Sequence, residues 1–248
     1  MIKYAMISET GNHRAKNDDR VNVFEKDDNV LAILCDGMGG YQYGDFAAAT
    51  VVTDIGLDFI NSFSFIDNIQ VKKWIFSAID KVKNRLKKIS DNNKNYSKMG
   101  TTIVGALIIP SQERIFVFNV GDSRCYALTK SQDFVQITKD QNVANKLIAE
   151  GLPEKSAFSL RVARHLTSAI GPSSKTVVEI SDFDQKSYAK LQKLILTSDG
   201  VHEFVRKDEL KYIVSDQNDV KYIANKLIET ATINESNDNM SVIAIEME

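Results

Sequence analysis

The sequence predicts a layered α+β fold, in which strands pair with neighbouring strands and helices pack outside them. Two observations lead to this prediction. Short segments with β-branched or alternating apolar residues recur along the 248 residues, and segments with helical periodicity lie between groups of them. Because strands follow strands and helices follow helices, α+β layers are favoured over a strictly alternating parallel sheet.

The expected elements follow from these two periodicities. The expected strands cover 4–8, 21–25, 30–35, 101–109, 115–120, 125–128, 134–138, 177–180, 194–197 and 241–245. The expected helices cover 46–59, 69–89, 142–150, 207–213 and 220–230. In the longest of them Ile75, Ile79 and Leu86 share one face, which predicts a buried stripe opposite a lysine-rich solvated surface.

The overall composition is that of an ordinary globular protein. Hydrophobic residues make up 43% and charged residues 26% of the chain, and the formal charge is −2, so nothing global favours a nucleic-acid or membrane partner. No repeat or linker divides the sequence, which predicts one domain over 1–248.

Cys35 and Cys125 lie in apolar stretches and are expected to be buried free thiols. Without a signal-peptide pattern or a long apolar run, the chain is expected to be cytoplasmic.

Glycine is scarce, so its placement is informative. The chain has 12 Gly and 3 Pro, where average usage of about 7% and 5% would give roughly 17 and 12. Several of these glycines flank an aspartate at the end of an apolar strand: 30–35 leads into Asp36, 115–120 into Asp122 and 194–197 into Asp199. Further acids stand at Asp238 and at the pair 18–19.

Acids at strand ends predict a cation site. A carboxylate at the end of a buried strand is costly unless it is paired, and several together repel one another. A hard divalent cation resolves both problems, and oxygen ligands favour Mg²⁺, Mn²⁺ or Ca²⁺ over zinc. Each Asp-Gly pair alone is better explained as a turn, but three at strand ends favour a metal cluster. His13, His165 and His202 show no zinc-ligand spacing.

The motifs then match a known family in order and spacing. They are GNHRAKNDD at 11–19, DGMGG at 36–40, MGTT at 99–102, NVGDSR at 119–124, SDG at 198–200 and NDN at 237–239. This set resembles the metal-dependent Ser/Thr protein phosphatases of type 2C (the PPM family) in their compact bacterial form. The resemblance implies a four-layer α-β-β-α sandwich with two central antiparallel sheets.

The resemblance also implies a core site for two ions, Mn²⁺ or Mg²⁺. Asp36 is expected to bridge them, and the Gly37 carbonyl to bind the second. Asp199 and Asp238 are expected to complete the ligands of the first ion. Arg14 matches the arginine that binds the substrate phosphate. Arg14 and Asp36 are thus the expected catalytic residues.

Additional acids are implied around this core. Asp18 and Asp19 match an acid pair near the second ion, where the family often has Glu-Asp, so Asp18 is a shorter variant. Asp122 is expected to hold a third, weaker ion together with Asp199. Glu203 stands where an aspartate often assists that ion, which leaves its role open.

The implied reaction is attack by a metal-bridging water on phosphorus, without a phosphoenzyme. Met38 occupies a position where many eukaryotic members carry a histidine proposed as general acid. Methionine cannot donate a proton, so a metal-bound water or His13 is the alternative donor. The stretch 141–171 matches the flap that bacterial members place beside the active site.

The expected substrates are phosphoserine and phosphothreonine proteins, with a partner Ser/Thr kinase whose action the enzyme reverses. The family default is a monomer. Two alternatives stay open at this point. A catalytically weak relative acting as a phosphoprotein-binding regulatory module should have lost Asp36, Asp199 or Asp238, and all are present. A metal-dependent phosphodiesterase or nuclease should show basic grooves and histidine-rich ligands, which these motifs lack.

Overall fold

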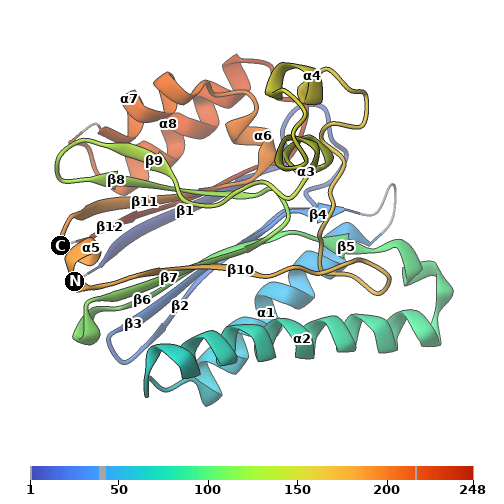
Figure 1. The fold of residues 1–248 in the computed structure, drawn as a ribbon, viewed down its shortest axis with the longest axis horizontal. Coiled ribbons are helices and arrows are strands. Elements are labelled where there is room, and N and C mark those ends of the chain that lie inside the picture. The colour runs from blue at the N-terminus through green and yellow to red at the C-terminus, as the bar shows by residue number, and fades with distance from the viewer. Residues whose placement is uncertain (1, 39–42, 216, 248) are drawn as a thin grey trace.

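The chain forms two antiparallel sheets packed face to face, with helices on both outer surfaces (Figure 1). This is a computed structural model, and it describes residues 2–38, 43–215 and 217–247. The first sheet has the order β1 (Lys3–Glu9), β12 (Met240–Glu246), β11 (Leu191–Thr197), β8 (Arg124–Thr129), β9 (Phe134–Gln136). The second has the order β10 (Glu179–Phe183), β7 (Arg114–Val120), β6 (Ile103–Ile109), β3 (Asn29–Cys35), β2 (Arg20–Lys26). A small ladder pairs β4 (Gly37–Met38) with β5 (Gly100–Thr101).

The helices form the two outer layers, which confirms the predicted four-layer α-β-β-α sandwich. On the second sheet lie α1 (Gly44–Ser62) and α2 (Asn68–Asn92). On the first sheet lie α6 (Asp199–His202), α7 (Lys207–Ser215) and α8 (Val220–Ile233). Shorter elements are η1 (Lys94–Lys98), η2 (Pro110–Gln112), α3 (Val143–Ala149), α4 (Glu154–Phe158) and α5 (Gln185–Tyr188).

The central strands are buried on both faces, which explains their continuous apolar sequences. In β3, Leu31 and Ile33 pack towards α1 and α2. Their neighbours Ala32 and Leu34 point the opposite way, into the layer between the two sheets, where they share a cluster with Ile243 of β12. β3 carries no charged residue, and its acid, Asp36, follows directly after the last residue of the strand.

Aspartate side chains cap the start of two of the outer helices. The Asp67 carboxylate accepts the Gln70 N–H at 2.8 Å and begins α2, and Asp219 does the same for α8. On the lysine-rich surface of α2, ion pairs to acids of neighbouring elements hold Lys72, Lys81 and Arg85. No helix in the described ranges is long and apolar enough to cross a bilayer.

Several predicted boundaries were wrong. The strand predicted over 101–109 breaks at Thr102, whose N–H donates to the Asp36 carbonyl at 2.9 Å instead of joining a ladder. The strand predicted over 177–180 lies at Glu179–Phe183, and the one over 134–138 ends at Gln136. The helices α4, α5 and α6 were missed because five or four residues are too short to show helical periodicity.

We predict that Gly105→Ala destabilises the fold by about 1–3 kcal/mol, because overpacking strains a filled core. A Cβ at Gly105 would lie 2.3 Å from Cζ of Phe118, its partner across the ladder of β6 and β7. Urea unfolding of the two proteins measures the difference. Lys88→Ala, on the exposed surface of α2, serves as the control and should change stability by less than about 0.5 kcal/mol. Equal stability of Gly105→Ala and wild type would contradict this packing.

Candidate metal centre

The predicted acids meet at one end of the sandwich, where β3, β7 and β11 end. Asp36 follows β3 directly, Asp122 lies two residues beyond β7, and Asp199 lies two residues beyond β11. They line a cavity of about 810 Å³. The predicted residues that line it are His13, Arg14, Asp18, Asp36, Gly37, Met38, Asp122, Asp199 and Asp238. The glycines predicted at 39 and 40 lie outside the described residues.

Close backbone contacts fix the spacing of these acids. A Cβ on Gly200 would lie 2.0 Å from the Asn239 carbonyl oxygen, so only glycine lets the start of α6 approach the turn before β12. This contact places Asp199 beside Asp238. A Cβ on Gly37 would lie 2.5 Å from the backbone oxygen of Asp18, so the turn after β3 touches the 11–19 loop in the same way.

The cluster is electrostatically strained in the absence of a counter-charge. Burial, followed by the negative charges of Asp199 and Asp19, raises the pKa of Asp36 well above its usual range. Burial and then the charge of Asp238 raise the pKa of Asp199. Burial and then the charge of Asp199 raise the pKa of Asp122 to about 8. These carboxyl groups therefore need either protons or cations at neutral pH.

Asp19 lies behind the cavity rather than on its lining. The residue is 2% exposed, and its carboxylate accepts the Ser198 hydroxyl at 2.7 Å. Burial raises the pKa of Asp19 to about 7, and hydrogen bonds from serine hydroxyls oppose that rise. Asp18, by contrast, lines the cavity and lies 3.0 Å from the Lys16 ammonium nitrogen. Of the predicted acid pair, Asp18 is thus the member that faces the site.

Arg14 stands at the mouth of the cavity and is tied to one of its acids. Its Nη2 donates to Asp238 Oδ2 at 2.5 Å, and its Nε donates to the Asn237 carbonyl at 3.2 Å. The side chain is half exposed, which leaves part of its donor fork free for an anion in the cavity.

The donor set fits hard divalent cations. Asp199 Oδ1 is buried and has no hydrogen-bond partner among the described residues. The acidic side chains on the cavity lining are all aspartates, so they offer oxygen ligands, which Mg²⁺ and Mn²⁺ prefer. Within the described ranges no three His, Cys, Asp or Glu side chains converge as a finished ligand set, and Arg14 occupies Asp238 instead.

Hydroxyl and amide side chains for which the sequence predicted no role hold the backbone beside the acids in place. The Thr102 hydroxyl accepts the Asp36 N–H at 3.0 Å and lies 2.7 Å from the Ser123 hydroxyl. Asn239 Oδ1 accepts the Asp18 N–H at 2.8 Å. Position was the available signal for Ser123 and Asn239, because each adjoins an acid within its motif, whereas Thr102 lies in the MGTT motif, which contains no acid.

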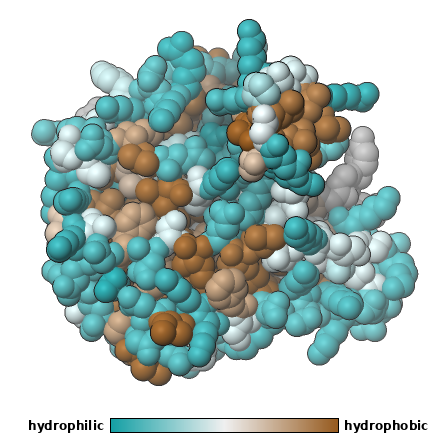
Figure 2. Space-filling model, in the orientation of Figure 1, coloured by the Kyte–Doolittle hydropathy of each residue, from teal (hydrophilic) through white to brown (hydrophobic). Residues whose placement is uncertain are grey.

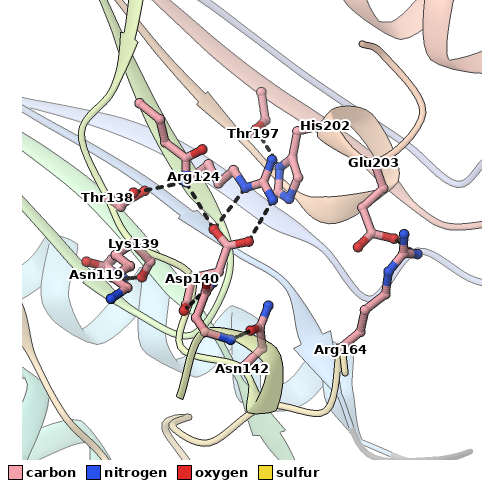
Figure 3. A network of polar contacts seen from close by, with 12 residues as sticks. Asn119, Arg124, Thr138, Lys139, Asp140, Asn142, Arg164, Thr197, His202 and Glu203 are labelled. Carbon is pink, nitrogen blue, oxygen red and sulfur yellow. Dashed lines mark hydrogen bonds and ion pairs between the residues drawn. The ribbon is translucent and has the colours of Figure 1, made fainter. Parts of the chain in front are cut away.

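The 141–171 segment contacts the cavity through Arg164 and Leu166. It carries α3 and α4 and a small apolar cluster that includes Ala144 and Ala157. Its exposed apolar side chains are visible as the hydrophobic area over α4 in Figure 2. Its Arg164 contacts Glu203 (Figure 3). Glu203 is absent from the residues found on the cavity lining.

The other histidines and the two cysteines lie outside the cavity lining. His202 is buried with its Nδ1 2.9 Å from the Thr197 hydroxyl (Figure 3), and His165 is exposed on the 141–171 segment. Both predicted free thiols are buried. Burial raises the pKa of the Cys35 thiol well above its ordinary value, which keeps it protonated and unreactive.

The two-sheet sandwich thus carries a cavity whose clustered carboxylates suit divalent cations and whose arginine suits an anion. Comparison with known proteins identifies the family. The sequence pattern described as protein phosphatase 2C matches residues 7–147. The chain belongs to the protein phosphatase 2C family, which confirms the resemblance seen in the motifs.

Individual relatives resemble the chain over nearly its whole length. A putative protein phosphatase of Mycoplasma genitalium is 28% identical over 98% of this chain and 94% of its own. The crystal structure of serine/threonine phosphatase Stp1 from Staphylococcus aureus has a TM-score of 0.89 and 28% identity, covering 100% of this chain and 96% of that one. The catalytic domain of phosphatase PstP, in complex with 2 manganese ions, has a TM-score of 0.80 at 24% identity, covering 99% and 97%, and supports the fold alone.

We predict that the cation-free protein loses stability as pH rises from about 4 to about 8. The raised pKa values of Asp19 (about 7) and Asp122 (about 8) mean that the folded state retains protons that the unfolded chain has released, since an unperturbed aspartate titrates near 3.9. The free energy of unfolding therefore falls with pH over this interval.

Thermal unfolding in EDTA should give a higher Tm at pH 5.5 than at pH 8, and added Mn²⁺ should raise the Tm at pH 8. Asp122→Asn should flatten the pH dependence. A cation-free Tm that rises between these pH values would show that the carboxylates are not strained as described.

Proposed function

We propose that the chain is a metal-dependent protein serine/threonine phosphatase, which hydrolyses phosphoserine and phosphothreonine in proteins. The observation that carries the proposal is the convergence of Asp36, Asp199 and Asp238 with Arg14 on one cavity. Membership of the protein phosphatase 2C family supports the same activity. We take residues 1–248 as one catalytic domain, with 141–171 as its flap.

Two ions, Mn²⁺ or Mg²⁺, would be held by the acids of the cavity. Asp36 would serve both, with the Gly37 carbonyl on the second, and Asp199 and Asp238 would complete the first. Asp18 would act near the second ion, with Asp19 supporting it from behind. Such ions, when bound, polarise a phosphoryl oxygen and lower the pKa of water towards about 7.

The remaining groups bind and orient the substrate. Arg14 would place its planar fork on the substrate phosphate and stabilise the negative charge that develops there. To do so it would exchange part of its contact with Asp238 for the phosphate, and its exposure at the mouth allows this.

We propose direct attack by water, without a phosphoenzyme. The described lining includes no serine or cysteine. Its only hydroxyl side chain, Thr102, is 1% exposed and is engaged with the Asp36 N–H and with Ser123. The leaving-group oxygen also needs a proton. Met38 lines the cavity but cannot donate one, whereas His13, also on the lining, can.

The proposed activity also implies the substrates and the partner enzyme. The substrates would be phosphoproteins, and a Ser/Thr kinase would supply them. The flap would help to select them and would gate the cavity, because Arg164 and Leu166 lie on the lining. We further propose a cytoplasmic monomer.

A second candidate is a catalytically weak relative that binds phosphoproteins as a regulatory module. The pairing of Arg14 with Asp238 favours it, because that contact occupies one acid of the proposed core site. Turnover separates the two candidates, since a binding module would retain the phosphopeptide unchanged.

The proposed activity predicts that the purified protein hydrolyses a phosphothreonine peptide in the presence of Mn²⁺ and stops in EDTA. The physical reason is that the carboxylate cluster needs cations to bind an anionic phosphate. Phosphate release is measured with phosphothreonine, phosphoserine and phosphotyrosine peptides in parallel. Absence of turnover with both Mn²⁺ and Mg²⁺ across several peptides would leave the binding module as the better assignment.

Asp36→Asn and Asp199→Asn should each lower turnover by at least about 100-fold, beyond the usual effect of losing an outer-shell partner. Both should leave the fold intact, because each removes one of several repelling charges. Circular dichroism and phosphopeptide hydrolysis test this together. The matched control is Asp54→Asn, which removes a carboxylate paired with Arg85 on α1 and α2. Near-normal activity of either cavity variant would refute the site assignment.

A further inference from the structure

Lys16 lies on the cavity lining and takes no part in the proposed reaction. Its ammonium nitrogen lies 3.0 Å from Asp18 Oδ1 and 3.1 Å from Asp45 Oδ1. Asp18 lines the cavity, whereas Asp45 stands in the first turn of α1 and is not among the lining residues. One ammonium group therefore bridges an acid of the cavity and an acid of the outer helical layer.

The two contacts of Lys16 differ in quality. The contact with Asp45 is a hydrogen bond. Asp18 Oδ1 lies within ion-pair distance of the same nitrogen, but it is buried and has no hydrogen-bond partner among the described residues. Asp199 Oδ1, on the same cavity, is also buried without a partner. Lys16 thus compensates the charge of Asp18 without satisfying this oxygen, which leaves the oxygen open to a divalent cation.

The backbone around Lys16 and Asp18 is fixed, so that a rearrangement here falls to the side chains. Asn239 binds this backbone at two points: its Oδ1 accepts the Asp18 N–H at 2.8 Å, and its Nδ2 donates to the Lys16 carbonyl at 3.0 Å. The Lys16 side chain is 45% exposed, and its four-carbon stem is flexible. The ammonium group can therefore leave Asp18 and keep its hydrogen bond to Asp45.

We propose that the Lys16 ammonium group stands in for the cation at Asp18, which makes Lys16 a positioning residue for that acid. In the cation-free protein the ammonium group offsets the repulsion that Asp18 feels from the other carboxylates. When a divalent ion binds, the ammonium group moves off Asp18 and remains on Asp45. Binding therefore displaces a positive charge, so Lys16 lowers the cation affinity at Asp18 and Asp45 recovers part of that loss. The inference rests on the proposed function, because it concerns the ion assigned near Asp18.

The experiment measures Mn²⁺ binding to the full chain without substrate, by isothermal titration calorimetry and by electron paramagnetic resonance of free Mn²⁺. Lys16→Met should tighten one site about fivefold, the factor that corresponds to a strong exposed ion pair, and change the other sites by less than about twofold. In EDTA the same variant should have a lower Tm than the wild type, because Asp18 has lost its counter-charge. A residue that only supported the fold would lower stability and affinity together.

A double-mutant cycle separates this exchange from general electrostatics. Asp45→Asn alone should weaken the same site, because Lys16 then has only Asp18 to bind. In the Lys16→Met background, Asp45→Asn should lose most of this effect, since Asp45 acts through Lys16 and the two changes are coupled. The matched control is Lys81→Met, which removes an ammonium group 2.9 Å from Asp58 on α1 and outside the cavity. This control should bind Mn²⁺ as the wild type does.

Mn²⁺ affinity of Lys16→Met equal to or weaker than that of the wild type overturns the inference, as do additive effects in the cycle. If Lys16→Met does not fold, Lys16→Gln decides the question. Phosphopeptide hydrolysis by the wild-type protein is measured in the same preparation. Turnover with unchanged Mn²⁺ binding in the variants overturns this inference alone. The expected changes in Mn²⁺ binding without turnover overturn the proposed function alone, and a wild-type protein that binds no Mn²⁺ overturns both.

Discussion

The repulsion among buried carboxylates is the interaction on which this structure depends. The strands that lead to Asp36, Asp122 and Asp199 are covered by apolar layers, the three acids lie just beyond the strand ends, and all three strands end at the same side of the sandwich. Grouping them there costs stability, because burial and mutual charge raise their pKa values. The same strain is a source of cation affinity, since a divalent ion replaces repulsion with attraction.

The surrounding polar residues make this arrangement tolerable. The Thr102 hydroxyl and the Asn239 amide hold the backbone beside the acids, and the Ser198 hydroxyl donates to the Asp19 carboxylate itself, so none of them adds charge. Arginines balance the outer acids: Arg14 binds Asp238 and Arg164 contacts Glu203. Both arginine side chains are at least half exposed, so each can exchange its carboxylate for another anion.

Much of this was predictable from sequence, and the limits have physical causes. Continuous apolar runs such as 30–35 predicted the central strands, and the acids at their ends predicted the site. The position of Asp19 was not predictable, because only tertiary packing turns it towards Ser198 while its neighbour Asp18 faces the cavity. The break at Thr102 and the Gln141–Gly121 bonds also depend on contacts between distant segments, which leave no periodicity in the sequence.

The contact of Gly200 with the Asn239 carbonyl has a consequence for how the site could change over time. The separation of the Asp199 and Asp238 backbones is set by main chain against main chain, so it does not depend on any side-chain rotamer. Substitutions in the surrounding loops can alter which molecules reach the cavity while the spacing of the charged groups stays constant. The spacing of these two backbones is therefore fixed by a contact that tolerates no added methyl group, whereas the residues around the cavity entrance can vary.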